Sequence, residues 1–151
     1  MTSFNIEQKR VDVFASAAPD RPVIYLNTYG REGKQVFKHL QETGCPDFSL
    51  VAVSNLEWDH DMAPWDIPPI SEKDTPCTGG SDDYLKLLLN QILPEAEKAL
   101  PGIPSWRGIA GYSLAGLFIR FIRQTFFHGL PVCPVPCGFR ESKITSLPTR
   151  L

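Results

Sequence analysis

One serine, flanked by small residues, is the feature of this sequence best suited to chemistry. Ser113 lies in the hexapeptide 111–116 (GYSLAG), with Gly111 two residues before it and Ala115 two residues after it. A serine hydroxyl is a poor nucleophile unless it stands on a tight turn beside a general base. Small residues at these two positions allow that turn, and the common pattern has glycine at both. The spacing predicts Ser113 as a catalytic nucleophile.

The segments on either side of Ser113 determine what the serine can do. Apolar residues from 114 to 127 predict a helix, whose first amides face the serine and whose dipole favours negative charge there. The Leu114 amide is therefore an expected oxyanion donor, and the turn after an earlier strand should supply a second, at Thr28 or Tyr29. The competing interpretation makes Ser113 a simple cap in a turn of small residues. The apolar segments on both sides favour the nucleophile.

Asp59, His60 and Asp61 form a second cluster with chemical potential. These residue types bind metal ions. Side chains on three adjacent residues point in different directions, however, so a polar loop beside the site is the favoured interpretation. His60 could serve as a general base only if this loop folded over Ser113.

Two tryptophans and two cysteines also need an interpretation. Trp58 and Trp65 flank the acidic loop, and they either line a substrate pocket or anchor the loop against the core. Cys133 and Cys137 are spaced like half of a zinc site, but no second pair completes it. We therefore expect neither a metal nor a cofactor.

Alternating strands and helices must position these residues. Short apolar runs rich in β-formers predict strands at residues 23–26, 48–53 and 107–111. Apolar residues at helical spacing predict helices around residues 36–40, from residue 81 and over 114–127. Ser81 is expected to cap the second helix and Pro94 to kink or split it, while residues 54–80 have no helical or strand period. This order implies an α/β fold with a parallel sheet, and a site at the carboxyl ends of the strands.

Five segments resemble the esterase family of α/β-hydrolases that includes esterase D-like enzymes and siderophore esterases. They are PVIYLN (22–27), DHDMAPW (59–65), GGSDDYL (79–85), ILP (92–94) and GIAGYSLAGLF (108–118). Together they span nearly all of residues 20–118. The resemblance implies a three-layer α/β-hydrolase fold and ester hydrolysis through an acyl-serine, without metal or cofactor. It also implies that Asp59, His60, Asp61 and Trp65 lie on the substrate side of the site.

The last part of the chain departs from this family pattern. In this fold the triad acid precedes the histidine and both follow the serine. After Ser113 there is one histidine, His128, and one acid, Glu141, in the reverse order. Residues 1–118 carry 10 Lys/Arg and 16 Asp/Glu, whereas residues 119–151 carry five and one. The general base and the orienting acid are therefore expected to be missing.

A frameshift near residues 118 and 119 is our hypothesis for this departure. With suitable synonymous codons, a frame that begins one base earlier resembles the family's own continuation, with a helix end and a strand-like AASVSG segment. Residues 1–118 would then be a partial α/β-hydrolase domain. Residues 119–151 would be a non-native tail, poorly structured beyond the nucleophile helix. We expect such a chain to be marginally stable and at best weakly active.

The composition of the chain limits the classes of binding partner and the cellular location that we expect for it. A net charge of −2 argues against bulk-charge binding to nucleic acid or to anionic membranes. No apolar run approaches the ~20 residues that a membrane helix needs. The first 18 residues do not resemble a secretory signal, and the four cysteines do not suggest a disulfide framework, so a cytoplasmic location is expected. The expected partner is a small-molecule ester, and the oligomeric state stays open.

Three functions fit these patterns. The first is carboxylic ester hydrolysis through an acyl-serine at Ser113, crippled here by the missing acid and histidine. The second is a non-catalytic pseudo-enzyme or binding fragment. The third is acyl transfer from the same nucleophile to an alcohol. Labelling of Ser113 by an organophosphonate separates the catalytic alternatives from the pseudo-enzyme.

Overall fold

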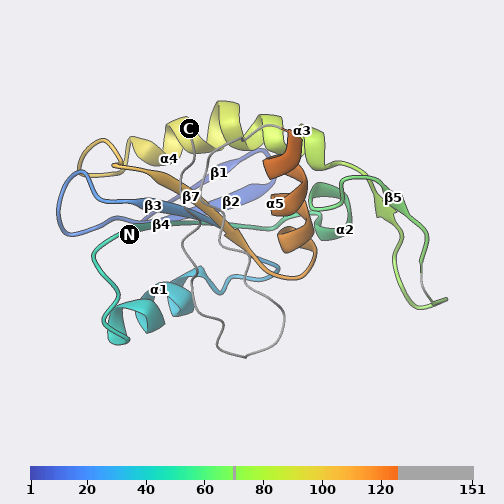
Figure 1. Ribbon diagram of the computed structural model, residues 1–151, viewed down its shortest axis with the longest axis horizontal. Coiled ribbons are helices and arrows are strands. Elements are labelled where there is room, and N and C mark those ends of the chain that lie inside the picture. The colour runs from blue at the N-terminus through green and yellow to red at the C-terminus, as the bar shows by residue number, and fades with distance from the viewer. Residues whose placement is uncertain (70, 126–151) are drawn as a thin grey trace, which may run out of the picture.

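The computed structural model has a mixed β-sheet with helices on both faces, and it describes residues 1–69 and 71–125 (Figure 1). Five strands lie in the order β1-β2-β4-β3-β7. β1 (Thr2–Ile6) and β2 (Lys9–Phe14) pair antiparallel, and β2 pairs antiparallel with β4. β3 (Val23–Asn27), β4 (Ser49–Ser54) and β7 (Arg107–Gly111) run parallel to one another, as predicted. β1 and β2 have no counterpart among the predicted strands.

Helices cover both faces of the sheet and make the α/β fold three-layered. α1 (Gly33–Glu42) lies on one face. The other face carries α3 (Ser81–Leu87), a π-helical turn (Leu88–Ile92), α4 (Leu93–Glu97) and α5 (Leu114–Thr125) (Figure 1). Successive side chains of a strand point to opposite faces. A strand between two helical layers therefore buries the side chains on both of its faces, and every residue of β4 is buried.

The carboxyl ends of the three parallel strands lie level with one another. Asn27 at the end of β3 pairs in register with Val53 of β4 on one side and with Gly111 of β7 on the other. The loop after β3, the loop after β4 and the turn after β7 therefore leave the sheet at the same edge. This edge carries the residues that the sequence singled out.

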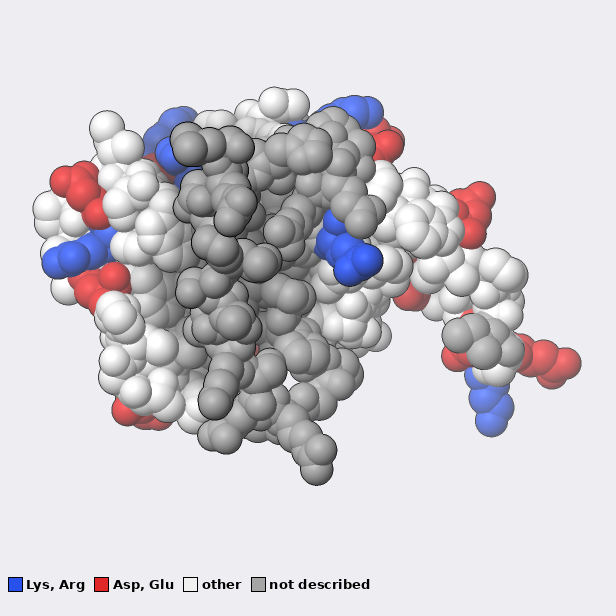
Figure 2. All heavy atoms as spheres, in the orientation of Figure 1, with Lys and Arg blue, Asp and Glu red and all other residues white. Residues whose placement is uncertain are grey.

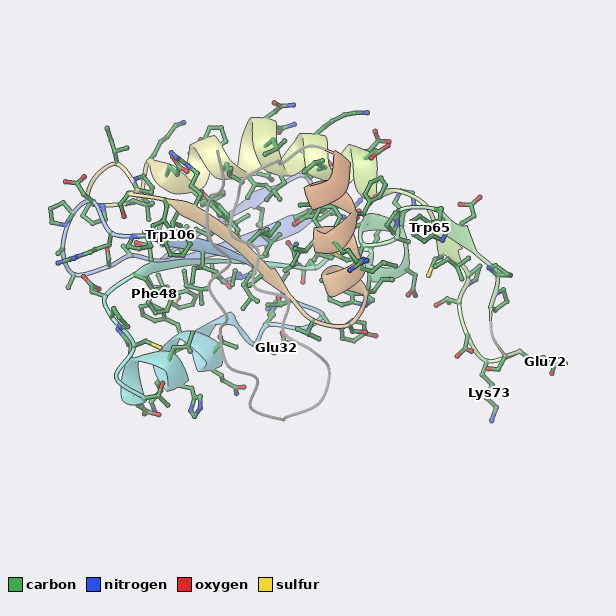
Figure 3. All side chains as sticks on the ribbon, viewed as in Figure 1. Glu32, Phe48, Trp65, Glu72, Lys73 and Trp106 are labelled. Carbon is green, nitrogen blue, oxygen red and sulfur yellow. The ribbon has the colours of Figure 1, made fainter. Side chains whose placement is uncertain are left out.

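Residues 54–80 contain short elements that the sequence did not predict. α2 (Trp58–Asp61) is a single turn, and β5 (Asp66–Ile67) pairs with β6 (Cys77–Thr78) in a small hairpin. Glu72 and Lys73 mark the tip of the hairpin, which projects away from the sheet (Figure 3). Elements of two to four residues are too short to show a periodic pattern. The expectation of an unstructured loop was therefore wrong for these residues.

The cap of α3 also differs from the prediction. Gly80 occupies the N-cap position, and Ser81 is the first helical residue with its side chain buried. The Ser81 amide donates to the Ala63 carbonyl at 3.2 Å, which draws Ser81 into the helix and out of the capping position. The predicted interruption at Pro94 is present as the π-helical turn directly before α4. A wider turn accommodates the missing amide proton of proline.

α5 runs through the point where the charge balance of the sequence changes. Phe118, Ile119 and Ile122 are all buried in the core between the helices and the sheet.

No helix within residues 1–69 and 71–125 is long and apolar enough to cross a membrane. Figure 2 shows acidic and basic side chains interspersed around the rim of the visible face.

Candidate active site

Ser113 occupies the turn between β7 and α5 in an unusual backbone conformation. Its φ is 52°, in the left-handed region that non-glycine residues rarely adopt, and its side chain is exposed. Such strain persists only where the surroundings enforce it, and it is concentrated at functional sites. The turn is closed by hydrogen bonds from the Ala115 amide to the Tyr112 carbonyl and from the Gly116 amide to the Ser113 carbonyl, both 3.0 Å.

Small residues at positions 111 and 115 are required by the close approach of α5 to β7. A Cβ placed on Gly111 would lie 2.7 Å from the Ala115 Cβ and 3.1 Å from the Ile119 Cδ1. No larger pair of side chains fits this contact without separating the helix from the strand. The packing therefore gives a physical reason for the spacing of small residues around Ser113.

Leu114 follows Ser113 directly and opens α5. Leu114 is the first residue of the helix, and first-turn amides have no partner within their own helix. The positive end of the helix dipole lies at the same point. This end of α5 can therefore stabilise negative charge next to Ser113.

The loop between β3 and α1 contacts the serine turn directly. The Thr28 amide donates to the Val53 carbonyl at 3.0 Å and so continues the sheet. The Tyr29 amide donates to the Tyr112 hydroxyl at 2.9 Å, so the residue before Ser113 touches the loop. Of the two oxyanion donors predicted in this loop, Thr28 is engaged by the sheet and Tyr29 faces the serine turn.

Glu32 completes this contact, and sequence reasoning missed it. The Tyr112 hydroxyl donates to one Glu32 carboxylate oxygen at 2.6 Å, and the other oxygen accepts the Gly30 amide at 3.0 Å. Figure 3 shows Glu32 below the turn that joins β7 to α5. Burial, and then the hydrogen bond to Glu32, raise the pKa of Tyr112. No local pattern could have found a pair 80 residues apart.

Aromatic rings pack around the same edge. The Trp58 ring contacts the rings of Tyr29 and Tyr112, with centroid separations of 5.4 and 5.6 Å. The Trp65 ring meets Phe121 of α5 edge-on at 6.4 Å and is 53% exposed. Both tryptophans therefore anchor the loop after β4, and Trp58 also lies beside the serine turn.

The acidic cluster points in three directions. Asp59 accepts a hydrogen bond from Thr75 at 2.5 Å, and the His60 Nδ1 lies 2.7 Å from the Thr78 hydroxyl. Asp61 forms a buried ion pair with Lys9 of β2. Within the described ranges, no group of three or more His, Cys, Asp or Glu side chains could hold a metal ion.

No described histidine contacts the serine. The His60 ring covers Gly80, where an added Cβ would meet the His60 Nε2 at 2.2 Å. His39 is exposed on α1, and His128 and Glu141 lie outside the described residues. Among residues 1–69 and 71–125, Ser113 has no hydrogen-bond partner for its hydroxyl.

Asn27 and Tyr84 form a buried polar pair beneath the site that the sequence did not single out. The Tyr84 hydroxyl donates to the Asn27 side-chain oxygen at 2.5 Å, and both residues are buried. Burial, and then the charge of Asp61, raise the pKa of Tyr84. A polar residue at the end of an apolar strand was the available signal for Asn27. The pair ties α3 to the end of β3, next to the loop that carries Tyr29.

Comparison with known proteins finds related folds among solved structures. No family model and no curated protein matches the sequence. The BES protein of Bacillus cereus superposes with a TM-score of 0.62 at 18% identity, over 83% of this chain and 58% of that one. The siderophore hydrolase EstA of Aspergillus nidulans superposes with a TM-score of 0.60 at 18% identity, over 78% of this chain and 49% of that one. An IroE-like serine hydrolase of Shewanella oneidensis superposes with a TM-score of 0.63 at 18% identity, over 82% of this chain and 45% of that one.

These comparisons bear on the fold. Two of the three similar structures are named as hydrolases, and the shared architecture agrees with the α/β class expected from the sequence. The chain spans 58%, 49% and 45% of the length of the three structures. We conclude that the chain has the α/β fold of these proteins over about half of their length.

Proposed function

We propose that this chain belongs to a carboxylic ester hydrolase that acts through an acyl-serine at Ser113. The observation that carries the proposal is the left-handed backbone of Ser113, at φ 52°, on an exposed turn between a parallel strand and a helix. We interpret this turn as a nucleophile elbow, in which the strand-to-helix turn raises the serine oxygen toward the substrate. The fold shared with a siderophore hydrolase and a serine hydrolase supports the same reaction class.

The proposed reaction has two steps. The Ser113 oxygen attacks the ester carbonyl carbon, the carbon–oxygen bond to the alcohol breaks, and the alcohol leaves with a proton. Water then attacks the acyl-serine and releases the acid. The Leu114 amide and the Tyr29 amide are the proposed oxyanion donors. The Thr28 amide is fixed by a backbone carbonyl of the sheet, whereas the partner of the Tyr29 amide is a side-chain hydroxyl that can be displaced.

The proposed substrate is a small-molecule ester. Siderophore hydrolysis is the printed activity of the Aspergillus protein, and we extend only the ester class to this chain. The exposed side chain of Tyr29, whose amide contacts the serine turn, suits an apolar portion of such a substrate.

The proposed activity of the chain as given is weak. A triad needs a histidine base and an acid that orients it. Neither contacts Ser113 within the described residues. Oxyanion stabilisation and binding alone retain roughly 10³–10⁴-fold over water in well-built sites. The lack of a histidine or acid at Ser113 among the described residues also favours a second candidate function, a binding protein that keeps the fold without catalysis.

Labelling with an organophosphonate probe tests the proposal. The probe forms a stable bond with an activated serine oxygen, so intact mass should show one adduct and peptide mapping should place it on Ser113. Ser113→Ala should abolish the adduct. Ser105→Ala removes an exposed serine just before β7 and should leave labelling unchanged. Absence of an adduct on the folded wild-type chain would favour the binding protein.

A further inference from the structure

We propose that the Tyr112 hydroxyl caps the Tyr29 amide and that Glu32 holds this hydroxyl in place. The cap must open before the amide can bind an oxygen of a ligand at Ser113. The inference rests on the proposed function, in which Tyr29 supplies the second oxyanion donor. It adds two residues, Tyr112 and Glu32, that control access to that donor.

The position of the Tyr112 oxygen carries the first step. It lies 2.9 Å from the Tyr29 nitrogen as the acceptor of its proton. Oxyanion donors lie about 2.7–3.1 Å from the oxygen that they stabilise. The phenol oxygen therefore occupies the place, relative to this amide, that an oxyanion would take. An amide has one proton, so Tyr112 and a ligand oxygen compete for it.

Glu32 makes the cap persistent. The Tyr112 hydroxyl donates to the Glu32 carboxylate at 2.6 Å, a short bond to a charged acceptor. A hydroxyl that donates to a carboxylate becomes a better acceptor in turn, which strengthens its bond from Tyr29. The second Glu32 oxygen holds the Gly30 amide at 3.0 Å, so one carboxylate fixes both the phenol and the loop.

The surroundings leave this cap accessible to a ligand. The Tyr29 ring is 69% exposed, and the Trp58 ring contacts both tyrosines from the side of the loop after β4. The capped amide belongs to an exposed residue, and its cap is the neighbour in sequence of the exposed Ser113. A purely structural brace between loop and turn would use the same contacts. It predicts that removal of the Tyr112 hydroxyl slows the labelling of Ser113, whereas a cap predicts that it speeds the labelling.

The first test measures hydrogen exchange of the Tyr29 amide, which does not depend on activity. Tyr112→Phe keeps the ring and removes the acceptor, so exchange of the Tyr29 amide should accelerate about tenfold. Glu32→Gln keeps the shape and weakens the hold on the phenol, so it should give a smaller increase. Tyr25→Phe is the matched control. It removes a hydroxyl that donates to Glu97, away from the turn, and should leave Tyr29 unchanged.

The second test measures the rate of organophosphonate labelling of Ser113 in the same variants. If the cap blocks the donor, Tyr112→Phe should raise the rate by up to about tenfold, because the open state no longer has to be populated first. Glu32→Gln should raise it less, and Tyr25→Phe should not change it.

The outcomes separate this inference from the proposed function. Unchanged exchange at Tyr29 in Tyr112→Phe overturns the cap. Faster exchange with slower labelling also overturns it, and shows that the phenol braces the site. If no variant, the wild type included, is labelled at Ser113, the proposed nucleophile fails and the role of the cap in ligand binding fails with it. Faster exchange together with faster labelling supports the inference.

Discussion

Gly111 of β7 lies directly against Ala115 of α5, and a Cβ on Gly111 would lie 2.7 Å from the Ala115 Cβ. The contact joins the last residue of the strand to the first turn of the helix, with Ser113 between them. The position of the serine therefore depends on two side chains that take no part in chemistry.

Replacement of Gly111 tests this contact. Gly111→Ala should destabilise the fold by about 1–3 kcal/mol, because the added methyl group forces strand and helix apart. Urea denaturation monitored by circular dichroism measures the change. Gly116→Ala is the matched control, since its Cβ would lie 3.8 Å from the Gly111 carbonyl oxygen, an ordinary van der Waals contact, and alanine favours a helix. Equal destabilisation by the two substitutions would contradict the packing argument.

The backbone of Ser113 gives a second prediction. Glycine adopts positive φ without steric cost, so Ser113→Gly should stabilise the fold by about 1 kcal/mol. Ser113→Ala keeps the Cβ and therefore the strain. The difference between the midpoints of the two variants measures the strain held at φ 52°. A Gly variant that is no more stable than the Ala variant would show that the turn is unstrained.

The buried ion pair of Lys9 and Asp61 anchors α2 to β2. Their side chains are 7% and 8% exposed, and Asp61 also accepts the Glu57 amide at 2.7 Å. Lys9→Met leaves a buried carboxylate without its cation and should destabilise the fold by about 3–5 kcal/mol. The double variant with Asp61→Asn should recover part of this loss, as denaturant titration of all four proteins would show. A double variant as unstable as the sum of the single ones would argue against coupling.

The pair of Glu97 and Arg107 predicts a pH dependence of stability. Arg107 of β7 donates two hydrogen bonds to the Glu97 carboxylate, at 2.6 and 2.7 Å, and Tyr25 donates a third at 2.9 Å. The hydrogen bond from Arg107 holds the pKa of Glu97 below its ordinary value. The carboxylate therefore contributes stability above the unfolded-state pKa near 4.5, and this contribution is lost as the pH falls through the lowered folded-state pKa.

Glu97→Gln isolates this contribution. We expect wild type to be more stable than the variant by about 1 kcal/mol at neutral pH, a value reduced by solvent screening of the half-exposed Arg107. The difference in stability between wild type and variant should vanish in acid, because Glu97 is then protonated and neutral, as the glutamine of the variant is at any pH. Glu95→Gln, in an exposed pair with Lys98, is the control and should show little difference at any pH. A difference that grows toward low pH would have the wrong sign.

The frameshift hypothesis has a direct genetic test. We expect the coding DNA across codons 115–145, taken from an independent source, to show one base gained or lost near codon 118. The charge balance changes from −6 over residues 1–118 to +4 over residues 119–151, which is the reason for the expectation. An intact frame would make the residues after 118 genuine, including Ile122 in the core, and would favour the binding protein.

Local periodicity explains which elements could be predicted. The strands that became β3, β4 and β7 and the helix that became α5 each repeat a pattern over five or more residues. β1 and β2 were not predicted, although Val11 and Val13 of β2 alternate with polar residues. α2, β5 and β6 were missed because hydrogen bonds between distant residues, and not local patterns, define them.

The sequence by itself determined the α/β class, the parallel direction of three strands and the place of Ser113 between strand and helix, because hydrophobic pattern and small-residue spacing are local properties. Only the tertiary structure decided that the Tyr29 amide meets Tyr112, that Glu32 holds Tyr112, and that His60 lies against Gly80. These contacts join segments up to 83 residues apart. Their geometry depends on the twist and register of the sheet, which no single segment encodes.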